Sequence, residues 1–155
     1  MELTFRVRRM DASARLSDLR TRSGTVVLPE FFPVYNPNRP VVTAKEMERM
    51  GVRALITNSY IIYRTPELRE RALSEGVHSL LGFSGVVMTD SGAYQIYRYG
   101  DVEVSNEEIL RFQHEIGSDI GSILDVPMSS EVSRGDAERG VQKTLESARE
   151  WASLR

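Results

Sequence analysis

The stretch Val86-Val87-Met88-Thr89-Asp90-Ser91-Gly92-Ala93-Tyr94-Gln95 passes from a short apolar run into a polar turn that contains glycine. A run that is apolar on both faces is typical of a buried parallel strand. Asp90 would place a carboxylate at the end of that strand, Gly92 allows the backbone to approach a ligand closely, and Tyr94 could stack on a heterocycle. Gln95 adds an amide that donates and accepts hydrogen bonds. The stretch predicts a ligand site at a strand end, although an Asp-Ser-Gly turn beside a core tyrosine would also fit.

Three other short apolar runs resemble residues 86–89, and they lie at residues 31–35, 54–57 and 120–124. Each is followed by a polar residue where the strand would give way to a loop, namely Asn36, Asn58 and Asp125. In βα folds the carboxyl ends of the parallel strands form the working edge of the sheet. One polar residue at such a point is usually a turn former or a helix cap, but four in succession, Asp90 included, favour a site.

The spacing of these polar residues indicates repeated βα units. Asn58, Asp90 and Asp125 follow one another at intervals of about 32 and 35 residues, which suits a βαβ unit. A closed (β/α)8 barrel needs on the order of 250 residues, so this chain has room for about four units. We therefore expect an α/β fold in which residues 31–155 form the N-terminal half of a TIM barrel. Imperfect alternation in residues 3–9, 14–20 and 24–28 predicts a small antiparallel strand group within residues 1–30.

Capping residues mark the starts of the helices expected between the strands. The predicted starts are Thr43 with Glu46, Thr65 with Pro66, Ser105 with Glu108, and Ser133 with Asp136. In the last helix an apolar stripe recurs at helical spacing. Its residues are Val141, Leu145, Ala148 and Ala152. We expect this stripe to lie on a sheet.

The composition is that of an ordinary globular protein. Hydrophobic residues make up 41% of the 155 residues and charged residues 27%, and no apolar run approaches the length of a spanning helix. The first ten residues lack the apolar core and the cleavage site of a secretory signal, so we expect a soluble, cytoplasmic protein with no membrane partner. The absence of cysteine excludes disulfides, thiol nucleophiles and thiolate metal sites from these residues.

The formal charge of −2 offers no general attraction to a nucleic acid, so any such contact would come from a local patch. Residues 1–22 hold six arginines against three acidic residues. This excess could bind phosphate groups. It also suits the solvated face of a hairpin, which is the simpler interpretation.

Asp125 and Asp119 are the other carboxylates of interest. Asp125 follows a largely apolar run and stands shortly before a proline, so we expect it to be partly buried, with a raised pKa and a partner or ligand. A carboxylate there suits the N1–H and amino edge of a guanine-like base. Asp119 is predicted to be structural, at the opposite end of the barrel. His78 and His114 lack a carboxylate pattern and a second ligand at metal spacing, so we expect ordinary helix residues and no metal site.

The motif Met88-Thr89-Asp90-Ser91-Gly92-Ala93-Tyr94-Gln95 resembles the Asp-Ser-Gly-aromatic-Gln segment of tRNA-guanine transglycosylases. Other segments that resemble this family occur in the same order on both sides of it. They are Thr57-Asn58-Ser59-Tyr60, residues 99–106, Phe112-Gln113, residues 116–120 and Leu124-Asp125-Val126-Pro127. Residues 58–63 and Tyr99-Gly100 resemble the archaeal branch rather than the bacterial one.

The resemblance implies a (β/α)8 barrel enzyme that exchanges a guanine in tRNA for a 7-deazaguanine. In the archaeal branch the incoming base is 7-cyano-7-deazaguanine, which enters the D-loop of tRNA during archaeosine biosynthesis. The implied mechanism is a double displacement, in which an aspartate attacks the ribose C1′ and guanine leaves. The incoming base then reopens the covalent intermediate.

Carried over to this chain, the resemblance makes Asp90 the catalytic carboxylate that assists proton transfer at the exchanged base, not the nucleophile. Tyr94 would stack on that base, Asp125 would hydrogen-bond its polar edge, and Asn58 would position Asp90 or the ribose. The implied substrate-binding residues are Asp125, Tyr94, Asn58, Ser91, Gly92 and Gln95.

Three features of the family have no counterpart in these residues: the nucleophilic aspartate of a later strand, the glycine-rich base-binding loop and the cysteine-rich zinc site. Met128-Ser129-Ser130 also departs from the family's Thr-Pro-Pro-like continuation. We therefore expect part of a split or truncated enzyme, with no cofactor of its own and inactive alone. A half barrel leaves unpaired sheet edges, so it should bind a complementary C-terminal chain or self-associate.

Two alternatives remain open from the sequence. One is a noncatalytic half-barrel protein that binds tRNA or a base, or acts as a scaffold. The other is an unrelated barrel enzyme that uses Asp90 and Asp125 as an acid and base pair.

Overall fold

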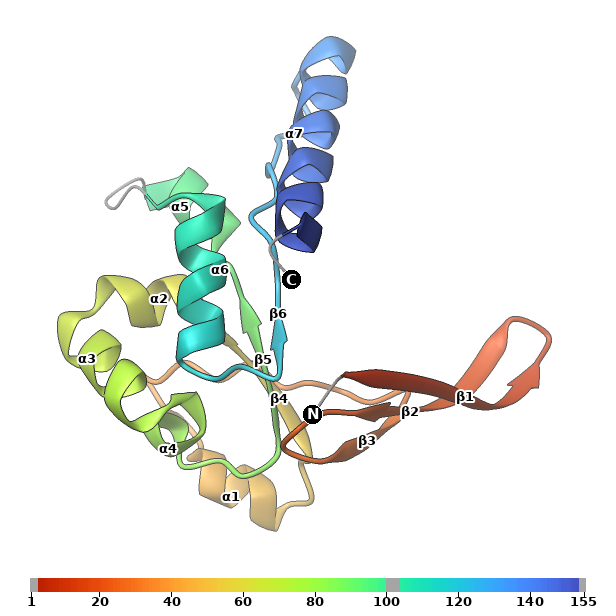
Figure 1. Cartoon of the computed structure of the whole chain (residues 1–155), viewed down its shortest axis with the longest axis vertical. Coiled ribbons are helices and arrows are strands. Elements are labelled where there is room, and N and C mark those ends of the chain that lie inside the picture. The colour runs from red at the N-terminus through yellow and green to blue at the C-terminus, as the bar shows by residue number, and fades with distance from the viewer. Residues whose placement is uncertain (1–2, 100–103, 154–155) are drawn as a thin grey trace.

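The computed structural model describes residues 3–99 and 104–153, which form a mixed α/β structure with two three-stranded sheets (Figure 1). One sheet is antiparallel and the other is parallel. The α/β class expected from the sequence is confirmed. Within the family-like segment at residues 99–106, residues 100–103 lie outside the described residues.

The antiparallel sheet comprises β1 (Thr4–Asp11), β2 (Ala14–Arg20) and β3 (Thr25–Leu28), paired in that order. These strands confirm the strand group predicted in the first thirty residues. The β1–β2 hairpin projects from the rest of the molecule (Figure 1), and every residue of β1 is exposed. The hairpin arginines therefore lie on solvated strands, and Arg8 pairs with Asp18 at 2.5 Å.

The parallel sheet comprises β4 (Ala54–Asn58), β5 (Val86–Asp90) and β6 (Ile120–Gly121), in that order. Its register pairs Asn58 with Asp90 and Thr89 with Gly121. The strands predicted at residues 54–57 and 86–89 are confirmed, because both runs are rich in β-branched and apolar residues.

Two predicted strands were wrong in extent. Residues 31–35 make only an isolated bridge between Val34 and Ile56, because Pro33 has no N–H to donate to a ladder. The strand predicted at residues 120–124 ends at Gly121. Beyond it the Ser122 amide still donates to the Thr89 carbonyl of β5, the main chain of Ser122 pairs with the side chain of Gln113, and the chain then leaves the sheet.

Of the seven helices in the described residues, six follow the strands closely or link them. They are α1 (Ala44–Arg49), α2 (Ser59–Arg64), α3 (Pro66–Glu75), α4 (Val77–Leu81), α5 (Ala93–Tyr99) and α6 (Asn106–Glu115). Both predicted capping boxes, at Thr43 and Ser105, are present. The start at Pro66 is also confirmed, but the Thr65 hydroxyl donates to the Ile61 carbonyl rather than capping α3.

The two faces of the parallel sheet differ in burial. Side chains alternate between the faces of a strand, so Leu55 and Thr57 share one face of β4 and Ile56 lies on the other. Leu55, Thr57 and their partners on β5, Val87 and Thr89, are at most 1% exposed under the helices. α2, α4 and α6 supply this cover (Figure 1). On the opposite face Ile56 and its register partner Met88 are only partly buried.

The N-terminal end of that opposite face is closed by the antiparallel sheet. Val26 of β3 packs with Ala54 and Val86, the first residues of β4 and β5. Leu28 and Phe32 pack against the same group. One end of this face is thus sealed by apolar contacts, and the end at Asn58 and Asp90 is not.

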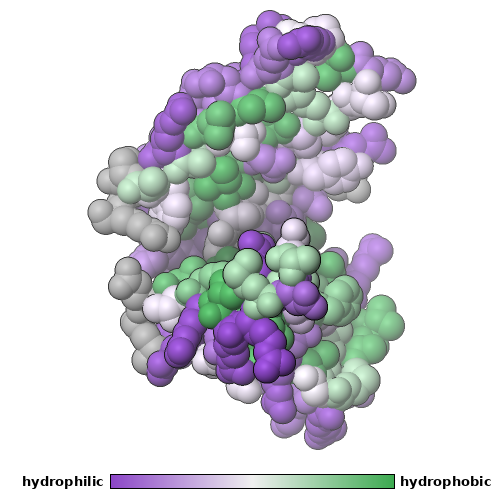
Figure 2. Space-filling view, turned by 90° about the vertical axis from the view of Figure 1, so that its right-hand side faces the viewer, coloured by the Kyte–Doolittle hydropathy of each residue, from purple (hydrophilic) through white to green (hydrophobic). Residues whose placement is uncertain are grey.

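The last helix, α7 (Arg134–Ser153), contradicts the expectation that its apolar stripe lies on a sheet. Val141 and Leu145 are 59% and 45% exposed, and Ala152 is exposed as well. The sheet does not continue past β6 in the described residues, so it offers no surface for the stripe. Instead Trp151 packs on the main core. Figure 2 views the molecule from the right-hand side of Figure 1 and shows exposed apolar residues, in green, in the upper half.

Asp119 joins the two sheets at the end opposite Asn58 and Asp90. Its carboxylate is fully buried, accepts from the Val87 and Ser23 amides at 2.9 and 3.3 Å, and lies 3.1 Å from His78 Nε2. Burial alone would raise the pKa of Asp119, but the hydrogen bonds from His78, Val87 and Ser23 outweigh it and lower the pKa to about 2. This matches the structural role expected of Asp119. No carboxylate pattern near His78 in the sequence indicates this contact, because the fold makes it between distant segments.

We expect replacement of Asp119 by asparagine to lower the free energy of unfolding by about 2 kcal/mol at pH 7. A depressed folded-state pKa stabilises the fold above the ordinary value of 3.8, and that contribution is lost as the pH falls towards 2. Urea unfolding at pH 7, 5 and 3 measures the difference between wild type and variant, which should shrink at pH 3. Asp11→Asn, at an exposed site on β1, is the control. A difference that is the same at all three pH values would contradict the assignment.

Candidate functional site

Asn58 and Asp90 form the centre of the candidate site. They end the neighbouring strands β4 and β5, and the parallel register places them opposite each other on the incompletely covered face. Asn58 Nδ2 donates to Asp90 Oδ2 at 2.7 Å and to Gln95 Oε1 at 3.1 Å. Asn58 Oδ1 accepts from the Ile61 amide at 2.9 Å and so caps α2. Bonds at both ends of its amide fix the orientation of Asn58, which in turn holds Asp90.

Asp90 keeps one carboxylate oxygen open. Its side chain is half-buried, and its carbonyl accepts from the Ser59 hydroxyl at 2.7 Å. Asp90 Oδ1 accepts no hydrogen bond from the part of the chain that the structure describes. A carboxylate held by one oxygen and open at the other can accept a hydrogen bond from a ligand or exchange a proton with it.

Gly92 makes the tight turn after Asp90 possible. Its φ is +84°, a backbone conformation that residues other than glycine rarely adopt. A Cβ on Gly92 would overlap the Cβ of Tyr60 and lie 3.1 Å from Asn58 Oδ1. The Gly92 carbonyl then accepts from the Ile96 amide at 3.0 Å, in the first turn of α5. The close approach of the turn to Asn58 therefore depends on glycine at this position.

Ser91 is buried, and its hydrogen bonds are made within the chain. Its amide donates to Ser122 Oγ at 2.8 Å, and its hydroxyl donates to the Ile123 carbonyl at 2.8 Å. These two bonds tie the end of β5 to the segment after β6. Ser91 was predicted to bind substrate, and the structure places it beneath the site rather than on its surface.

Tyr94 and Gln95 lie in the first turn of α5. Tyr94 is 59% exposed, so the alternative of a core tyrosine beside an ordinary turn is wrong. An exposed ring can stack on a planar ligand without displacing core side chains. Gln95 Oε1 is used by Asn58, whereas its Nε2 donates to no described residue and remains free to donate to a ligand.

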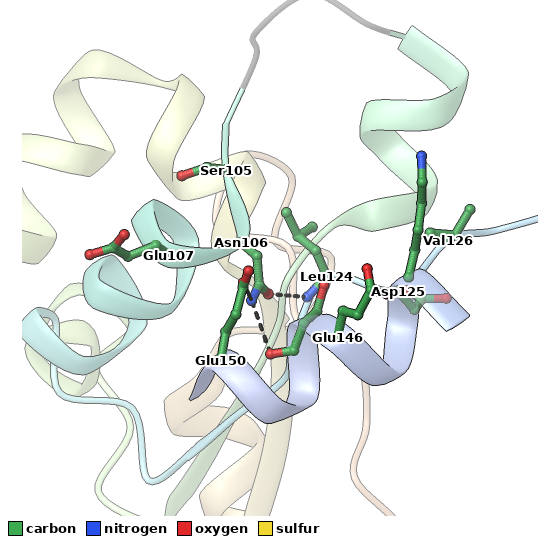
Figure 3. Close-up of a pocket in the computed structure, with 10 residues that line it drawn as sticks. Ser105, Asn106, Glu107, Leu124, Asp125, Val126, Glu146 and Glu150 are labelled. Carbon is green, nitrogen blue, oxygen red and sulfur yellow. Dashed lines mark hydrogen bonds between the residues drawn. The ribbon is translucent and has the colours of Figure 1, made fainter. Parts of the chain in front are cut away.

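Asp125 lies apart from this cluster. It lines an open cavity of about 700 Å³ between α6 and α7, beside Asn106, Leu124 and Glu146 (Figure 3). No hydrogen bond joins Asp125 to Asn58, Asp90 or Gln95 among the described residues. Partial burial was expected, but Asp125 is exposed. The cause is the short β6, because the chain leaves the sheet at Ser122 and no described strand lies on the far side of it.

The backbone around Asp125 is nevertheless held on both sides. The Leu124 amide donates to Asn106 Oδ1 at 3.0 Å, and Asn106 Nδ2 donates to the Ser147 carbonyl at 3.1 Å (Figure 3). The Val126 amide donates to Thr144 Oγ1 at 3.1 Å. Residues from α6 and α7 thus set the path of the chain at Asp125, which lines the cavity.

Asn36 is the fourth residue predicted to end a strand. Asn36 Oδ1 accepts from the Asn38 amide at 2.9 Å, so Asn36 is a turn former. Within residues 3–99 and 104–153, no group of three histidine or acidic side chains is arranged to hold a metal ion. In the same residues no helix is both long and apolar enough to cross a membrane.

Sequence reasoning missed the structural importance of Gln113. Its side chain is 2% exposed and bonds to Thr89 of β5 and to the main chain of Ser122. The signal was present in the sequence, because Gln113 falls on the buried stripe of α6 between Ile109 and Ile116. A polar residue in an apolar helical stripe needs internal hydrogen bonds.

We expect Gly92→Ala to lower the free energy of unfolding by about 2 kcal/mol or more, because it combines a strained φ with a steric overlap. Gly51→Ala is the matched control, since Gly51 also has a positive φ, +93°, but open space around its Cβ. Thermal and urea unfolding of both variants would separate the loss of stability that comes from the steric overlap from the loss that comes from the strained φ. Equal losses for the two variants would show that the contact of Gly92 with Tyr60 and Asn58 is unimportant.

Comparison with known proteins identifies the family. Residues 11–154 match the family model described as queuine tRNA-ribosyltransferase. The chain is 72% identical to the tRNA-guanine(15) transglycosylase of Korarchaeum cryptofilum over 155 residues, all of this chain and 26% of that protein. It is 49% identical to proteins of the same name from Thermococcus kodakarensis, over all of the chain and 27% of that protein, and Methanopyrus kandleri, over 99% and 34%.

The chain thus spans between about a quarter and a third of the length of these curated relatives. The family match nevertheless extends over almost all of its residues, including every residue of the candidate site. The chain belongs to the tRNA-guanine transglycosylase family.

Proposed function

We propose that this chain supplies the base-binding part of a tRNA-guanine transglycosylase that exchanges guanine for 7-cyano-7-deazaguanine in the D-loop of tRNA, in archaeosine biosynthesis. The observation that carries the proposal is the cluster of Asn58, Asp90 and Gln95 at the carboxyl edge of the parallel sheet. The names of the relatives and the archaeal character of residues 58–63 support it. We also propose a cytoplasmic location, where tRNA would be available.

The parallel sheet fits the first part of a (β/α)8 barrel. In such a barrel helices cover the outside of the sheet and the inner face is closed by the remaining strands. Leu55, Thr57, Val87 and Thr89 would face the outer helices, and Ile56 and Met88 the interior. The bridge between Val34 and Ile56 fits a first strand beside β4. On this proposal the described strands correspond to consecutive barrel strands, and the missing ones come from another part of the enzyme.

Asp90 is the proposed catalytic residue of this part. An aspartate outside these residues would attack the ribose C1′ and break its bond to guanine, and the incoming base would later restore that bond and release the aspartate. Asp90, with Oδ1 open, would accept or return the proton that each base must lose or gain. Asn58 positions Asp90 by holding Oδ2 at 2.7 Å.

The base itself would be held from two sides. Tyr94 would stack on its face, and the exposed carboxylate of Asp125 would accept from its N1–H and amino group. Gln95 would contribute its free amide, and the turn at Ser91 and Gly92 would bring backbone close to the ring. The exposure of Tyr94 and Asp125 suits residues that become covered only when a ligand and the remaining barrel are present.

The zinc site implied by the family would lie in the complementary part, together with the nucleophile. The residues of this chain do not fit zinc, because they include no cysteine and no described cluster of ligands. The proposed partners are therefore tRNA, the 7-deazaguanine base and a complementary C-terminal chain, with self-association as the other way to cover the open face. A noncatalytic base-binding or scaffolding role is the second candidate function.

Reconstitution tests whether the chain is an incomplete enzyme. We expect the isolated chain to incorporate no labelled guanine into tRNA, and the mixture with a complementary C-terminal chain of the same family to do so. The measurement is acid-precipitable label after incubation with unfractionated archaeal tRNA. Robust incorporation by the isolated chain would contradict incompleteness. Failure of every complementary chain to restore it would favour the scaffold.

In the reconstituted enzyme we expect Asp90→Asn to lower the rate of base exchange by roughly 10²- to 10⁴-fold, because the amide cannot carry the proton. Asn58→Ala should lower it less, since the carboxylate remains but is no longer held. Glu70→Gln, at an exposed site on α3, is the matched control and should leave the rate unchanged. The rates are measured as single-turnover label exchange at saturating tRNA. An Asp90→Asn enzyme as fast as the control would refute the catalytic role.

A further inference from the structure

Gln113 is a buried polar residue to which the proposed function gives no task. It lies on the inner side of α6 among Ile109, Phe112 and Ile116, and only 2% of it is exposed. A buried amide destabilises the fold unless its donors and acceptors are paired. Its hydrogen bonds therefore show what the residue holds in place.

The amide of Gln113 pairs with the main chain of Ser122 as a neighbouring strand would. Gln113 Oε1 accepts from the Ser122 amide at 3.0 Å, and Gln113 Nε2 donates to the Ser122 carbonyl at 2.9 Å. The Ser122 amide is shared, since it also donates to the Thr89 carbonyl of β5 at 3.2 Å. Oε1 also accepts from the Thr89 hydroxyl on β5 at 2.8 Å. The side chain thus continues the ladder at the point where β6 ends, and it links that point to β5.

Gly121 leaves the space that this arrangement needs. A Cβ on Gly121 would lie 3.1 Å from Gln113 Oε1, which is tighter than an ordinary Cβ contact, so the amide would have to shift by a few tenths of an ångström. Glycine at the end of β6 and glutamine on α6 therefore fit each other. A residue larger than glycine would push the amide away from Ser122.

Ser122, held by Gln113, is in turn hydrogen-bonded to the end of β5 at the candidate site. Its hydroxyl accepts from the Ser91 amide at 2.8 Å, and the Ser91 hydroxyl donates to the carbonyl of Ile123 at 2.8 Å. Ser91 directly follows Asp90, and Ile123 stands two residues before Asp125. A single amide inside the protein is thus connected by short hydrogen bonds to the backbone beside both carboxylates.

We propose that Gln113 is a positioning residue, which holds the ends of β5 and β6 at the separation that lets Asp90 and Asp125 contact one bound base together. The inference rests on the proposed function and deepens it, because it assigns the control of base binding to a residue that touches no base. A misplacement on the order of 1 Å in such a site is enough to impair binding or catalysis. The hydroxyls of Ser91 and Ser122 make the hydrogen bonds that connect Gln113 to the ends of the two strands.

Amide hydrogen exchange on this chain tests the connection without any enzyme activity. In Gln113→Met the amide of Ser91 should exchange at least tenfold faster, because the Ser122 hydroxyl that accepts from it is no longer fixed. The Ser122 amide keeps the Thr89 carbonyl as an acceptor, so its exchange should rise by a smaller factor. The amide of Val87, bonded to Asp119 at the other end of β5, should keep its protection. His114→Met, at an exposed position on the same helix, is the matched control. Unchanged exchange at Ser91 and Ser122 would overturn the connection.

Kinetics of the reconstituted enzyme test the consequence for base binding. We expect Gln113→Met to raise the KM for guanine roughly tenfold and to leave the KM for tRNA unchanged, which separates positioning from a loss of folded protein. A fall in kcat with both KM values unchanged would indicate reduced folded enzyme only and would overturn the proposal. Gly121→Ala, which leaves Gln113 in place, should raise the KM for guanine in the same direction by a smaller factor.

A double-mutant cycle tests whether Gln113 affects base binding through Ser122. If Gln113 acts through Ser122, the combined effect of Gln113→Met and Ser122→Ala on the KM for guanine should be clearly smaller than the product of the single effects. Independent effects would overturn that route. A wild-type assembly that exchanges no guanine would overturn the proposed function and the role of Gln113 in base binding, whereas the hydrogen-exchange result would still decide whether Gln113 holds Ser91.

Discussion

The parallel register between β4 and β5 is the constraint on which the rest of the structure depends. It sets Leu55 beside Val87 and Thr57 beside Thr89, all facing the helices, and by the same alternation it sets Asn58 beside Asp90 on the other face. A slip of one residue would turn the apolar set away from the helices and the polar pair into the core. The burial that stabilises the sheet therefore also determines which side chains meet at its edge.

The two ends of this sheet are organised by different forces. At the N-terminal end the apolar contacts of Val26 and the buried carboxylate of Asp119 join the antiparallel sheet to the parallel one. Asp119 is fully paired there, and its lowered pKa expresses that pairing. At the C-terminal end Asp90 is held by one oxygen only. The same residue type is thus structural at one end and available to a ligand at the other, because of how many donors surround it.

Local sequence rules predicted the features that short segments determine by themselves. The strands at β4 and β5, the capping boxes at Thr43 and Ser105, and the strand-end position of Asp90 all follow from residues within a few positions of each other. Their cause is local hydrogen bonding and alternation, which a single sequence contains. The candidate site could be anticipated for the same reason, since parallel strands bring their carboxyl ends to one edge.

The features that were wrong or missed depend on partners far along the chain. His78 contacts Asp119, and the buried amide of Gln113 accepts a hydrogen bond from Thr89 of β5. No spacing rule connects such residues, because the fold alone brings them together. The failed expectation for α7 has the same origin, since an amphipathic stripe predicts that a surface covers it and not where that surface comes from.

The sheet face that no described helix covers is also the face on which Asn58 and Asp90 lie. Val34, which bridges to Ile56, is 78% exposed, and Ile56 and Met88 are only partly buried. Covering one large apolar side chain contributes about 1.5 to 3 kcal/mol, whereas a whole domain is stable by only about 5 to 15 kcal/mol. In the proposed assembly, closure over a few such residues would therefore rival the stability of the chain alone. Asp125, exposed at the uncovered side of the short β6, would then become covered only as the barrel closes, so that base binding and assembly would depend on the same surface.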